Sequence, residues 1–298
     1  MKQVEERYIS LLTDFGFKRI FGTVMNKDLL ICFLNSLFNG RQVVKDVSYL
    51  NPEHVGDVYT DRKAIFDVYC EGENGEKFIV EMQNAYQAYF KDRSLFYSTF
   101  PIREQAPKGN DWDFKLNHVY TVALLNFNMN EDAFDKEKIR HHVQLCDTAT
   151  HKIFYDKLEF IYVEIAKFNK TLEELETLYE KWLYALKNLY KLTQRPKELC
   201  DKVFDRLFEE AEIAKFTPQE MREYEASKMA YRDIKNSIDT AKQEGLAEGM
   251  EKGMKKGMEK GMNQKALDIA RNMLADSVDI NLIMKYSGLT QEQIEKLK

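Results

Sequence analysis

Two short β-rich runs constrain the fold of this 298-residue chain more than any other part of its sequence: AIFDVYC at 64–70 and KFIVEMQ at 77–83. Runs of this length that are rich in β-branched and aromatic residues are typical of strands. The stretch between them contains three residues that favour a tight turn, Gly72, Asn74 and Gly75. The sequence therefore predicts a β-hairpin.

Acidic side chains interrupt both runs at positions that a hairpin would bring together. If the hairpin closes symmetrically on residues 73–75, Asp67 lies opposite Glu81, with the two carboxylates about 5 Å apart on one face. Such a pair destabilises a sheet unless a proton or a cation lies between the groups, and a hard divalent cation suits oxygen ligands. The hairpin therefore predicts a Mg²⁺ site, with Mn²⁺ as a second option. The alternative is an edge hairpin whose acids are ordinary solvated surface groups.

The segments around the hairpin predict a mixed α/β core. Residues 26–38 place apolar side chains at three- and four-residue spacing, which is typical of a helix packed on a core, and the same spacing recurs from 84 to about 105. Short strand-like runs stand at 47–50, 118–127 and 157–165. The expected order is therefore helix, strands, helix, strands.

Helical patterns continue from Thr171 to the end without a further convincing strand. The chain is therefore expected to divide into four parts: a core at 1–170, a helical extension at 171–244, a Gly/Met repeat at 245–263 and a small helical unit at 264–298.

The Gly/Met repeat places a glycine at every fourth position from Gly245 to Gly261. In a helix these glycines would form a stripe that lets another helix approach closely, which would support self-association through the C-terminal region. A frayed helical linker is the alternative, because each interior Gly costs about 1 kcal/mol against Ala.

The last two short helices are expected to begin at the capping residues Asp279 and Thr290, and together they resemble a helix-turn-helix. Residues 290–298 form only about two turns and carry few basic side chains. Self-association or substrate recruitment is therefore an alternative to base reading as the role of this region.

Composition limits the class of protein. The formal net charge of −5 offers no overall attraction to nucleic acid, so a DNA-binding surface would have to be a local basic face. No uncharged apolar run approaches the roughly 20 residues of a membrane-spanning helix, and no secretory pattern is visible. We therefore expect a soluble, cytoplasmic protein with no membrane partner. The scattered cysteines disfavour both a zinc site and a disulfide framework.

Four ordered segments together resemble the recombination-promoting nuclease / putative transposase family of the PD-(D/E)XK superfamily. They are TDFGFKRIFG at 13–22, the strand with Asp67, the VEMQ strand and RSLFYS at 93–98. The resemblance covers about residues 10–130, and the glycine repeat with its GL-x-x-x-x-I-x-x-L ending is also similar to family members. It implies a restriction-endonuclease-like α/β core, in which a mixed β-sheet is flanked by helices, followed by a helical C-terminal extension.

The resemblance also implies roles for three residues of the hairpin. Asp67 and Glu81 would bind the metal ion, and Gln83 stands where many relatives have Lys. Gln can orient a water molecule by hydrogen bonding but cannot supply the charge of Lys. The implied activity is Mg²⁺-dependent endonucleolytic hydrolysis of DNA, associated with recombination or mobile DNA. Gln83 keeps open the alternative of a nuclease-fold protein that binds DNA with weak catalysis or none.

Further residues are candidates for accessory roles. Asp14 and Lys18 lie one helical turn apart in a motif that, on the family's pattern, sits beside the active site, and a surface ion pair is the alternative. Lys63, Arg62 and Arg93 could reach phosphates near the hairpin. Arg93 is preferred because it follows the hairpin on the RSLFYS helix.

Two other groups of side chains are given no role in the site. Tyr86, Tyr89 and Tyr97 recur at helical spacing and are interpreted as core residues rather than as a base-stacking surface. His141 and His142 are interpreted as helix neighbours that point apart and bind no metal.

Overall fold

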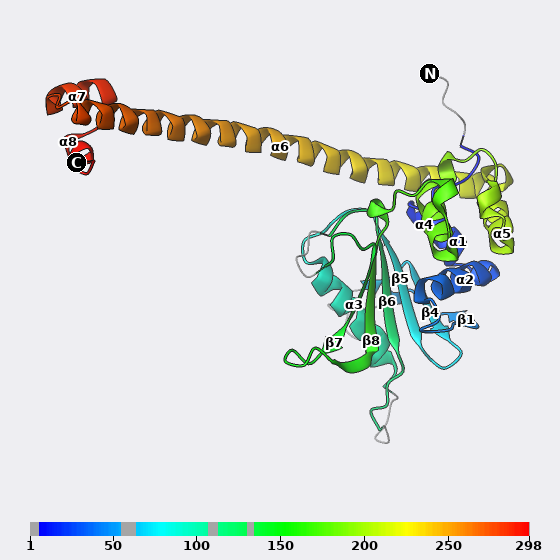
Figure 1. Ribbon diagram of the computed structural model, residues 1–298. Helices are drawn as coiled ribbons and strands as arrows, with labels where there is room; N and C mark the ends of the chain where they lie inside the picture. Colours follow the sequence, from blue (N-terminus) through cyan, green and yellow to red (C-terminus); the bar gives the residue numbers. More distant parts are fainter. Residues whose placement is uncertain (1–5, 55–63, 107–112, 130–133, 298) are drawn as a thin grey trace. The chain divides into compact units, whose positions relative to one another are not determined.

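The computed structural model describes residues 6–54, 64–106, 113–129 and 134–297, and its centre is a mixed six-stranded sheet (Figure 1). Its strands are β1 (Val47–Tyr49), β4 (Val68–Gly72), β5 (Lys77–Gln83), β6 (Val119–Leu125), β7 (Arg140–Cys146) and β8 (Ile153–Glu164). They follow the order β1-β4-β5-β6-β8-β7. Strands β5, β6 and β8 run parallel to one another, and the remaining neighbours are antiparallel.

Helices cover both faces of this sheet (Figure 1). They are α1 (Asp14–Phe21), α2 (Lys27–Phe38), α3 (Phe90–Glu104), α4 (Leu178–Asn188) and α5 (Lys202–Glu210). Helix α3 packs on one face, and α1, α2, α4 and α5 share a larger apolar core with the other. The α/β fold with a mixed sheet flanked by helices, expected from the sequence, is confirmed.

Alternate side chains of strand β5 point to opposite faces of the sheet and so belong to different cores. Phe78, Val80 and Met82 belong to the larger core, on the face that α1 and α2 cover. Ile79 points to the opposite face, where it packs in the small cluster beneath α3. Glu81 has the same parity as Ile79, so it lies on the α3 face.

The predicted hairpin is present with its expected register. Glu71 pairs with Lys77 and Val68 with Val80, so the hairpin closes on residues 73–75. Residues 64–70 are not one continuous strand, however. Residues 64 and 65 form β3 (Ala64–Ile65), which pairs with β2 (Glu53–His54) in a separate two-stranded sheet.

Two further expectations about elements need correction. Helix α3 begins at Phe90 rather than near residue 84. Strand β7 at the sheet edge was not expected, because its sequence, RHHVQLC, is mostly polar and only partly buried. His141 and His142 therefore lie on a strand and not on a helix, although as strand neighbours they still point to opposite faces.

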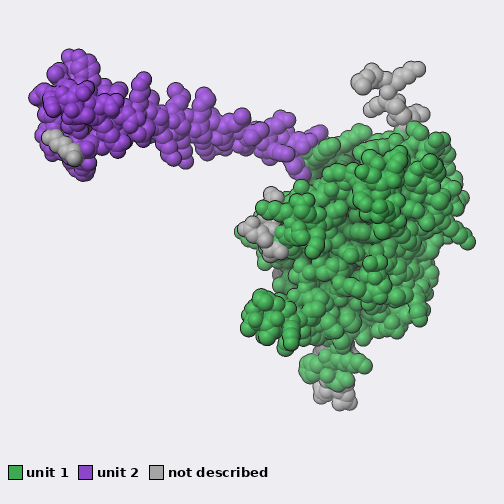
Figure 2. Space-filling view, in the orientation of Figure 1, with its two compact units in different colours: residues 1–235 green, residues 236–298 purple. Residues whose placement is uncertain are grey.

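The helices that follow residue 170 belong to the same core as the sheet. Trp182 on α4 and Phe204 on α5 are fully buried in it. The chain separates instead into compact units of residues 1–235 and 236–298 (Figure 2). The expected boundary near residue 170 therefore does not separate compact units, and the four-part division by role stays a prediction.

The second unit contains the C-terminal part of α6 (Pro218–Ala275), followed by α7 (Ile280–Ser287) and α8 (Gln291–Glu295). The expected caps are in place: the Asp279 carboxylate accepts from the backbone N–H of residue 281, and Thr290 Oγ1 from that of residue 293. Fully buried side chains join the three helices: Ala270, Ile283 and Ile294.

The Gly/Met repeat is helical throughout, and its role as a linker stays a prediction. Among the described residues, nothing lies within 4 Å of where a Cβ would stand on any glycine from Gly245 to Gly261. The four methionines of the repeat are 62–71% exposed. Close approach of another helix to this stripe stays a prediction.

In the part of the chain that the structure describes, no single helix is long and apolar enough to cross a membrane. A bent pair formed by α1 and residues 24–38 has the necessary length and composition, but most of its apolar side chains lie in the larger core.

Candidate active site

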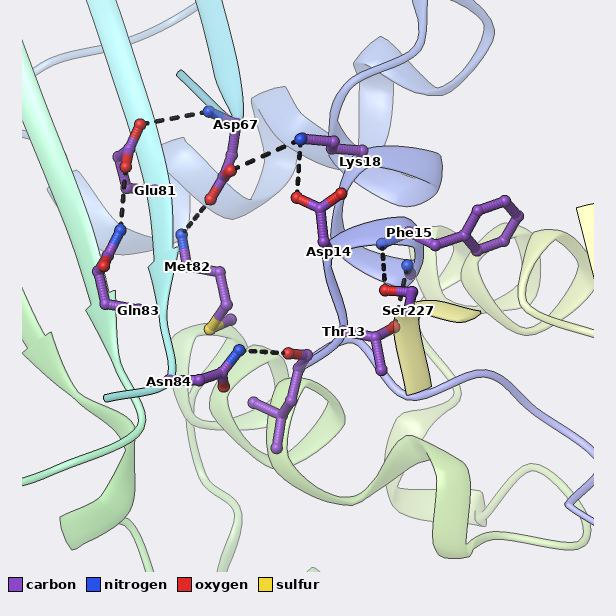
Figure 3. Close-up of polar contacts among 12 residues, drawn as sticks. Thr13, Asp14, Phe15, Lys18, Asp67, Glu81, Met82, Gln83, Asn84 and Ser227 are labelled. Atoms are coloured by element: carbon purple, nitrogen blue, oxygen red, sulfur yellow. Dashed lines mark hydrogen bonds and ion pairs between the residues drawn. The ribbon is translucent and has the colours of Figure 1, made fainter. Parts of the chain in front are cut away.

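The site lies where the hairpin begins and ends. Asp67 directly precedes β4, and the register of the hairpin, extended by one residue, brings it opposite Glu81 on β5 (Figure 3). Glu81 is only 7% exposed, and the Asp67 side chain is 21% exposed. Two carboxyl groups are therefore held together on the α3 face and largely out of water.

Hydrogen bonds lock this pair to the backbone of the hairpin. The backbone N–H of Met82 donates to Asp67 Oδ2 at 2.8 Å, so a side chain takes the place of a backbone acceptor from β4. The backbone N–H of Asp67 in turn donates to Glu81 Oε1 at 3.2 Å. These two bonds give a physical reason why the strand is interrupted at Asp67.

The N-terminal motif turns sharply to bring α1 beside the hairpin. Thr13 caps the helix, its Oγ1 accepting from the Gly16 backbone N–H at 3.1 Å. A Cβ on Gly16 would lie 2.1 Å from the carbonyl oxygen of Ser10. Only glycine fits at this close approach, which explains the glycine of the TDFG sequence.

Helix α1 places Lys18 between two acids (Figure 3). Its Nζ lies 2.7 Å from Asp14 Oδ1 and 3.9 Å from Asp67 Oδ1. The sequence offered two alternatives for Asp14 and Lys18: a surface ion pair, or a place beside the hairpin. The structure shows both.

Distant residues hold this N-terminal segment in place, and sequence reasoning missed them. Tyr224 and Ser227 on α6 accept from the backbone N–H groups of Ser10 and Phe15, each at 3.0 Å. Asn84, which directly follows the VEMQ run, donates to the Leu12 carbonyl at 2.7 Å. Adjacency to VEMQ was a usable signal for Asn84, whereas nothing in the sequence marks the two residues on α6.

Gln83 and Arg93 complete the cluster on the α3 side. Gln83 Nε2 donates to Glu81 Oε2 at 3.0 Å, and a guanidinium nitrogen of Arg93 donates to Gln83 Oε1. The other two basic candidates, Lys63 and Arg62, lie outside the described residues. The structure thus brings together every sequence-predicted site residue that it describes.

Burial dominates the electrostatics of the carboxyl pair. Desolvation, followed by repulsion from Asp67, raises the pKa of Glu81 to about 8. Desolvation also raises the pKa of Asp67, against the Met82 N–H and the charge of Lys18. For Lys18, burial lowers the pKa, but the hydrogen bond and the charge of Asp14 outweigh it, so the net direction is upward. Counting only the described residues, the site therefore has a deficit of positive charge.

The donor set fits a magnesium ion. Across the described ranges, no three His, Cys, Asp or Glu side chains converge as a complete protein cage for a metal. Mg²⁺ does not need such a cage, since it keeps several waters and is usually bound through one or two carboxylates. Asp67 and Glu81 provide that number.

Two of the three tyrosines interpreted as core residues are in fact on the surface. Tyr86 is 58% and Tyr89 is 78% exposed, and both line a hollow of about 220 Å³ at the start of α3. Tyr97 is half-buried, with its ring centroid 5.3 Å from that of Phe66. The helical spacing predicted a helix that included Tyr86 and Tyr89, but residues 84–89 precede the helix.

Two family models match this chain. The family model described as PD-(D/E)XK nuclease family transposase matches residues 11–241, and that described as Rpn/YhgA-like nuclease family, C-terminal HTH domain, matches residues 263–298. Searches among curated proteins and among solved structures gave no significant match. The first match spans well over half of the chain and confirms the resemblance of its N-terminal segments. The chain belongs to the PD-(D/E)XK nuclease family transposases.

Proposed function

We propose that this protein is a Mg²⁺-dependent endonuclease that hydrolyses DNA phosphodiester bonds, with Asp67 and Glu81 as the metal ligands. The observation that carries the proposal is the close Asp67–Glu81 pair, in which Glu81 is buried and Asp67 is partly buried. Holding a buried ion without a matching partner costs several kcal/mol. A fold that retains two such groups side by side is best explained by a cation that binds between them, and Mn²⁺ could replace Mg²⁺.

Each residue of the cluster has a role in this proposal. A bound Mg²⁺ would polarise a phosphate oxygen and lower the pKa of an attacking water. Asp67 is fixed by the Met82 N–H, so its second oxygen can serve as a ligand without reorganisation. Gln83 presents an amide N–H beside Glu81, where it can help to orient water. Lys18 is placed to attract a phosphate toward Asp67.

DNA is the proposed substrate because the C-terminal helix-turn-helix match and the family's name both favour it. The net charge of −5 means that binding must use local basic groups, and Lys18 and Arg93 supply two beside the site. Cleavage by hydrolysis would serve recombination or mobile DNA without strand joining. Self-association through the exposed Gly/Met repeat would bring two sites together on one DNA.

A catalytically weak DNA-binding protein is the second candidate, favoured by the uncharged Gln83. Measuring binding of Mg²⁺ and of DNA alongside cleavage separates the two functions. Binding of both without cleavage by the wild type would favour the second candidate.

The direct test is nicking of supercoiled plasmid with Mg²⁺. Asp67→Asn and Glu81→Gln should each lower the rate by at least about a hundredfold, because each removes one charge from a shared ion site. Glu76→Gln is the matched control, since Glu76 is also 7% exposed but serves the turn at the other end of the hairpin. Wild-type rates in both site variants would disprove the assignment.

A further inference from the structure

We infer that Arg93 is the positioning residue of the site: it fixes the carboxamide of Gln83 and supplies the positive charge that Gln83 lacks. This inference rests on the proposed nuclease function and extends it to the residue on α3 that completes the site. It is drawn from the contacts of Arg93 and Gln83 with their neighbours.

The contacts of Gln83 allow only one orientation of its carboxamide. A guanidinium group can only donate hydrogen bonds, so the amide oxygen must face Arg93. At the other end, Nε2 donates to Glu81 Oε2 at 3.0 Å. Without Arg93 the two ends of the amide could exchange, and an oxygen would then face the Glu81 carboxylate.

Arg93 itself is held by several contacts. Its second terminal nitrogen donates to Gln87 Oε1 at 2.5 Å. Its guanidinium carbon lies 5.6 Å from the ring centroids of both Phe90 and Tyr97, within the range of cation–π attraction. The half-buried side chain is therefore aimed at Gln83 before any substrate arrives.

The charge of Arg93 is not neutralised by a neighbouring acid. Among the residues that the structure describes, it forms no ion pair, and Gln83 and Gln87 are its polar side-chain partners. Its positive charge nevertheless acts on both Asp67 and Glu81. An unneutralised cation beside the carboxyl pair can stabilise negative charge that develops on a phosphate.

The intervening amide also keeps the cation away from the metal ligands. A Lys at position 83 would place an ammonium directly beside Glu81, where like-charge repulsion opposes metal binding. With Gln83 between them, Arg93 contributes its charge from one side chain further away. Loss of Arg93 should therefore reduce the rate of cleavage more than the affinity for Mg²⁺.

The test measures plasmid nicking across a Mg²⁺ titration for four variants: Arg93→Gln, Arg93→Lys, Gln83→Lys and the double variant Arg93→Gln/Gln83→Lys. Arg93→Gln should lower the maximal rate at least about tenfold, as loss of one preorganised charge does, with half-saturating Mg²⁺ changed less than about twofold. Arg93→Lys should recover part of the rate, because it restores charge without the planar fork. Gln83→Lys alone should be slower than wild type, since its ammonium faces Arg93.

The double variant is decisive, because a purely structural role for Arg93 on α3 would not be rescued by a cation at position 83 on β5. It should cut at least about threefold faster than Arg93→Gln, since an ammonium then stands on the same face without repulsion. Arg103→Gln, in the last turn of the same helix, is the control and should cut like the wild type.

Three results would overturn the inference: a wild-type rate for Arg93→Gln, a double variant no faster than Arg93→Gln, or loss of rate matched by equal loss of DNA binding. The last would make Arg93 a simple phosphate anchor. The wild type and Asp67→Asn are run alongside. If the wild type does not cut, or Asp67→Asn cuts equally well, the proposed function fails and the inference fails with it.

Discussion

Two buried carboxylates at the carboxyl ends of parallel strands are treated very differently in this fold. Glu81 lies near the end of β5, and Glu164 is the last residue of β8. The register across β6 places Gln83 level with Leu125, and Leu125 level with Glu164. The two acids thus share one edge of one sheet, so differences between them reflect their partners.

Glu164 has its own partners in the chain. It is fully buried, and its Oε1 lies 2.9 Å from His141 Nε2 and 2.8 Å from Lys167 Nζ. Its Oε2 accepts from the Met129 backbone N–H at 2.9 Å. The ring of Phe134 stacks on His141 with centroids 4.1 Å apart, which fixes the imidazole. This carboxylate is fully satisfied by the chain itself.

Among the residues that the structure describes, Glu81 has no such partners. Its oxygens accept from the Asp67 backbone N–H and from the Gln83 amide, and its closest acidic neighbour is Asp67. The nearby cations reach it only indirectly, Lys18 through Asp67 and Arg93 through Gln83. A buried carboxylate with its own ion-pair and hydrogen-bond partners serves the fold, whereas an uncompensated pair is suited to bind a cation.

The largest effect that follows from the difference between Glu164 and Glu81 is on the stability of the fold. Glu164→Leu should lower the free energy of unfolding by about 3–5 kcal/mol, because it leaves Lys167 and His141 without their acid. Glu81→Leu should leave it unchanged or raise it, because it removes an uncompensated charge. Urea unfolding at pH 8 without Mg²⁺ measures both. Equal destabilisation by the two variants would mean that Glu81 is also a structural acid.

The hairpin and its acids could be predicted from the sequence because their contacts are local. A short turn fixes the register of two adjoining strands, so Asp67 and Glu81 followed from spacing alone. The resemblance of four segments to a nuclease family then singled out these acids as the candidate site. The mixed sheet also followed, since its central strands are continuous apolar runs.

Partners far apart in the sequence could not be predicted. The acid Glu164 and its partner His141 belong to neighbouring strands, but polar β7 carried no strand signal. Tyr224 and Ser227 contact residues more than 200 positions away. Arg93 was a candidate for binding phosphate, yet its contact with Gln83 depends on how α3 packs on the sheet.

The second effect, smaller than the first, is a dependence of stability on pH. The ordinary pKa of a Glu side chain is 4.5, and burial followed by repulsion from Asp67 raises that of Glu81 to about 8. Between these values the folded chain binds more protons than the unfolded chain, so the free energy of unfolding falls as pH rises. The fall should be on the order of 2 kcal/mol, because Asp67 shares the titration.

Thermal unfolding of metal-free protein from pH 5 to 8 measures this slope. Glu81→Gln should remove most of it, whereas Glu76→Gln should keep it. At pH 8, Mg²⁺ should raise the Tm of the wild type but not that of Glu81→Gln, since ligands stabilise only the state that binds them. A slope that persists in Glu81→Gln would place the proton on another group.

The smallest effect concerns Lys167, the outer partner of Glu164. Its side chain is 18% exposed, so part of its hydration is kept in the folded state. If Lys167 is replaced by Met, Glu164 still has His141 and the Met129 backbone N–H. We therefore expect Lys167→Met to cost about 1 kcal/mol, as for a partly exposed ion pair, and Lys167→Arg to cost less. Urea unfolding of Lys167→Met and Glu164→Leu at pH 8 gives the ratio of their losses in free energy of unfolding. A loss as large as that of Glu164→Leu would mean that Lys167 alone stabilises Glu164, and the contrast with Glu81 would then rest on one partner.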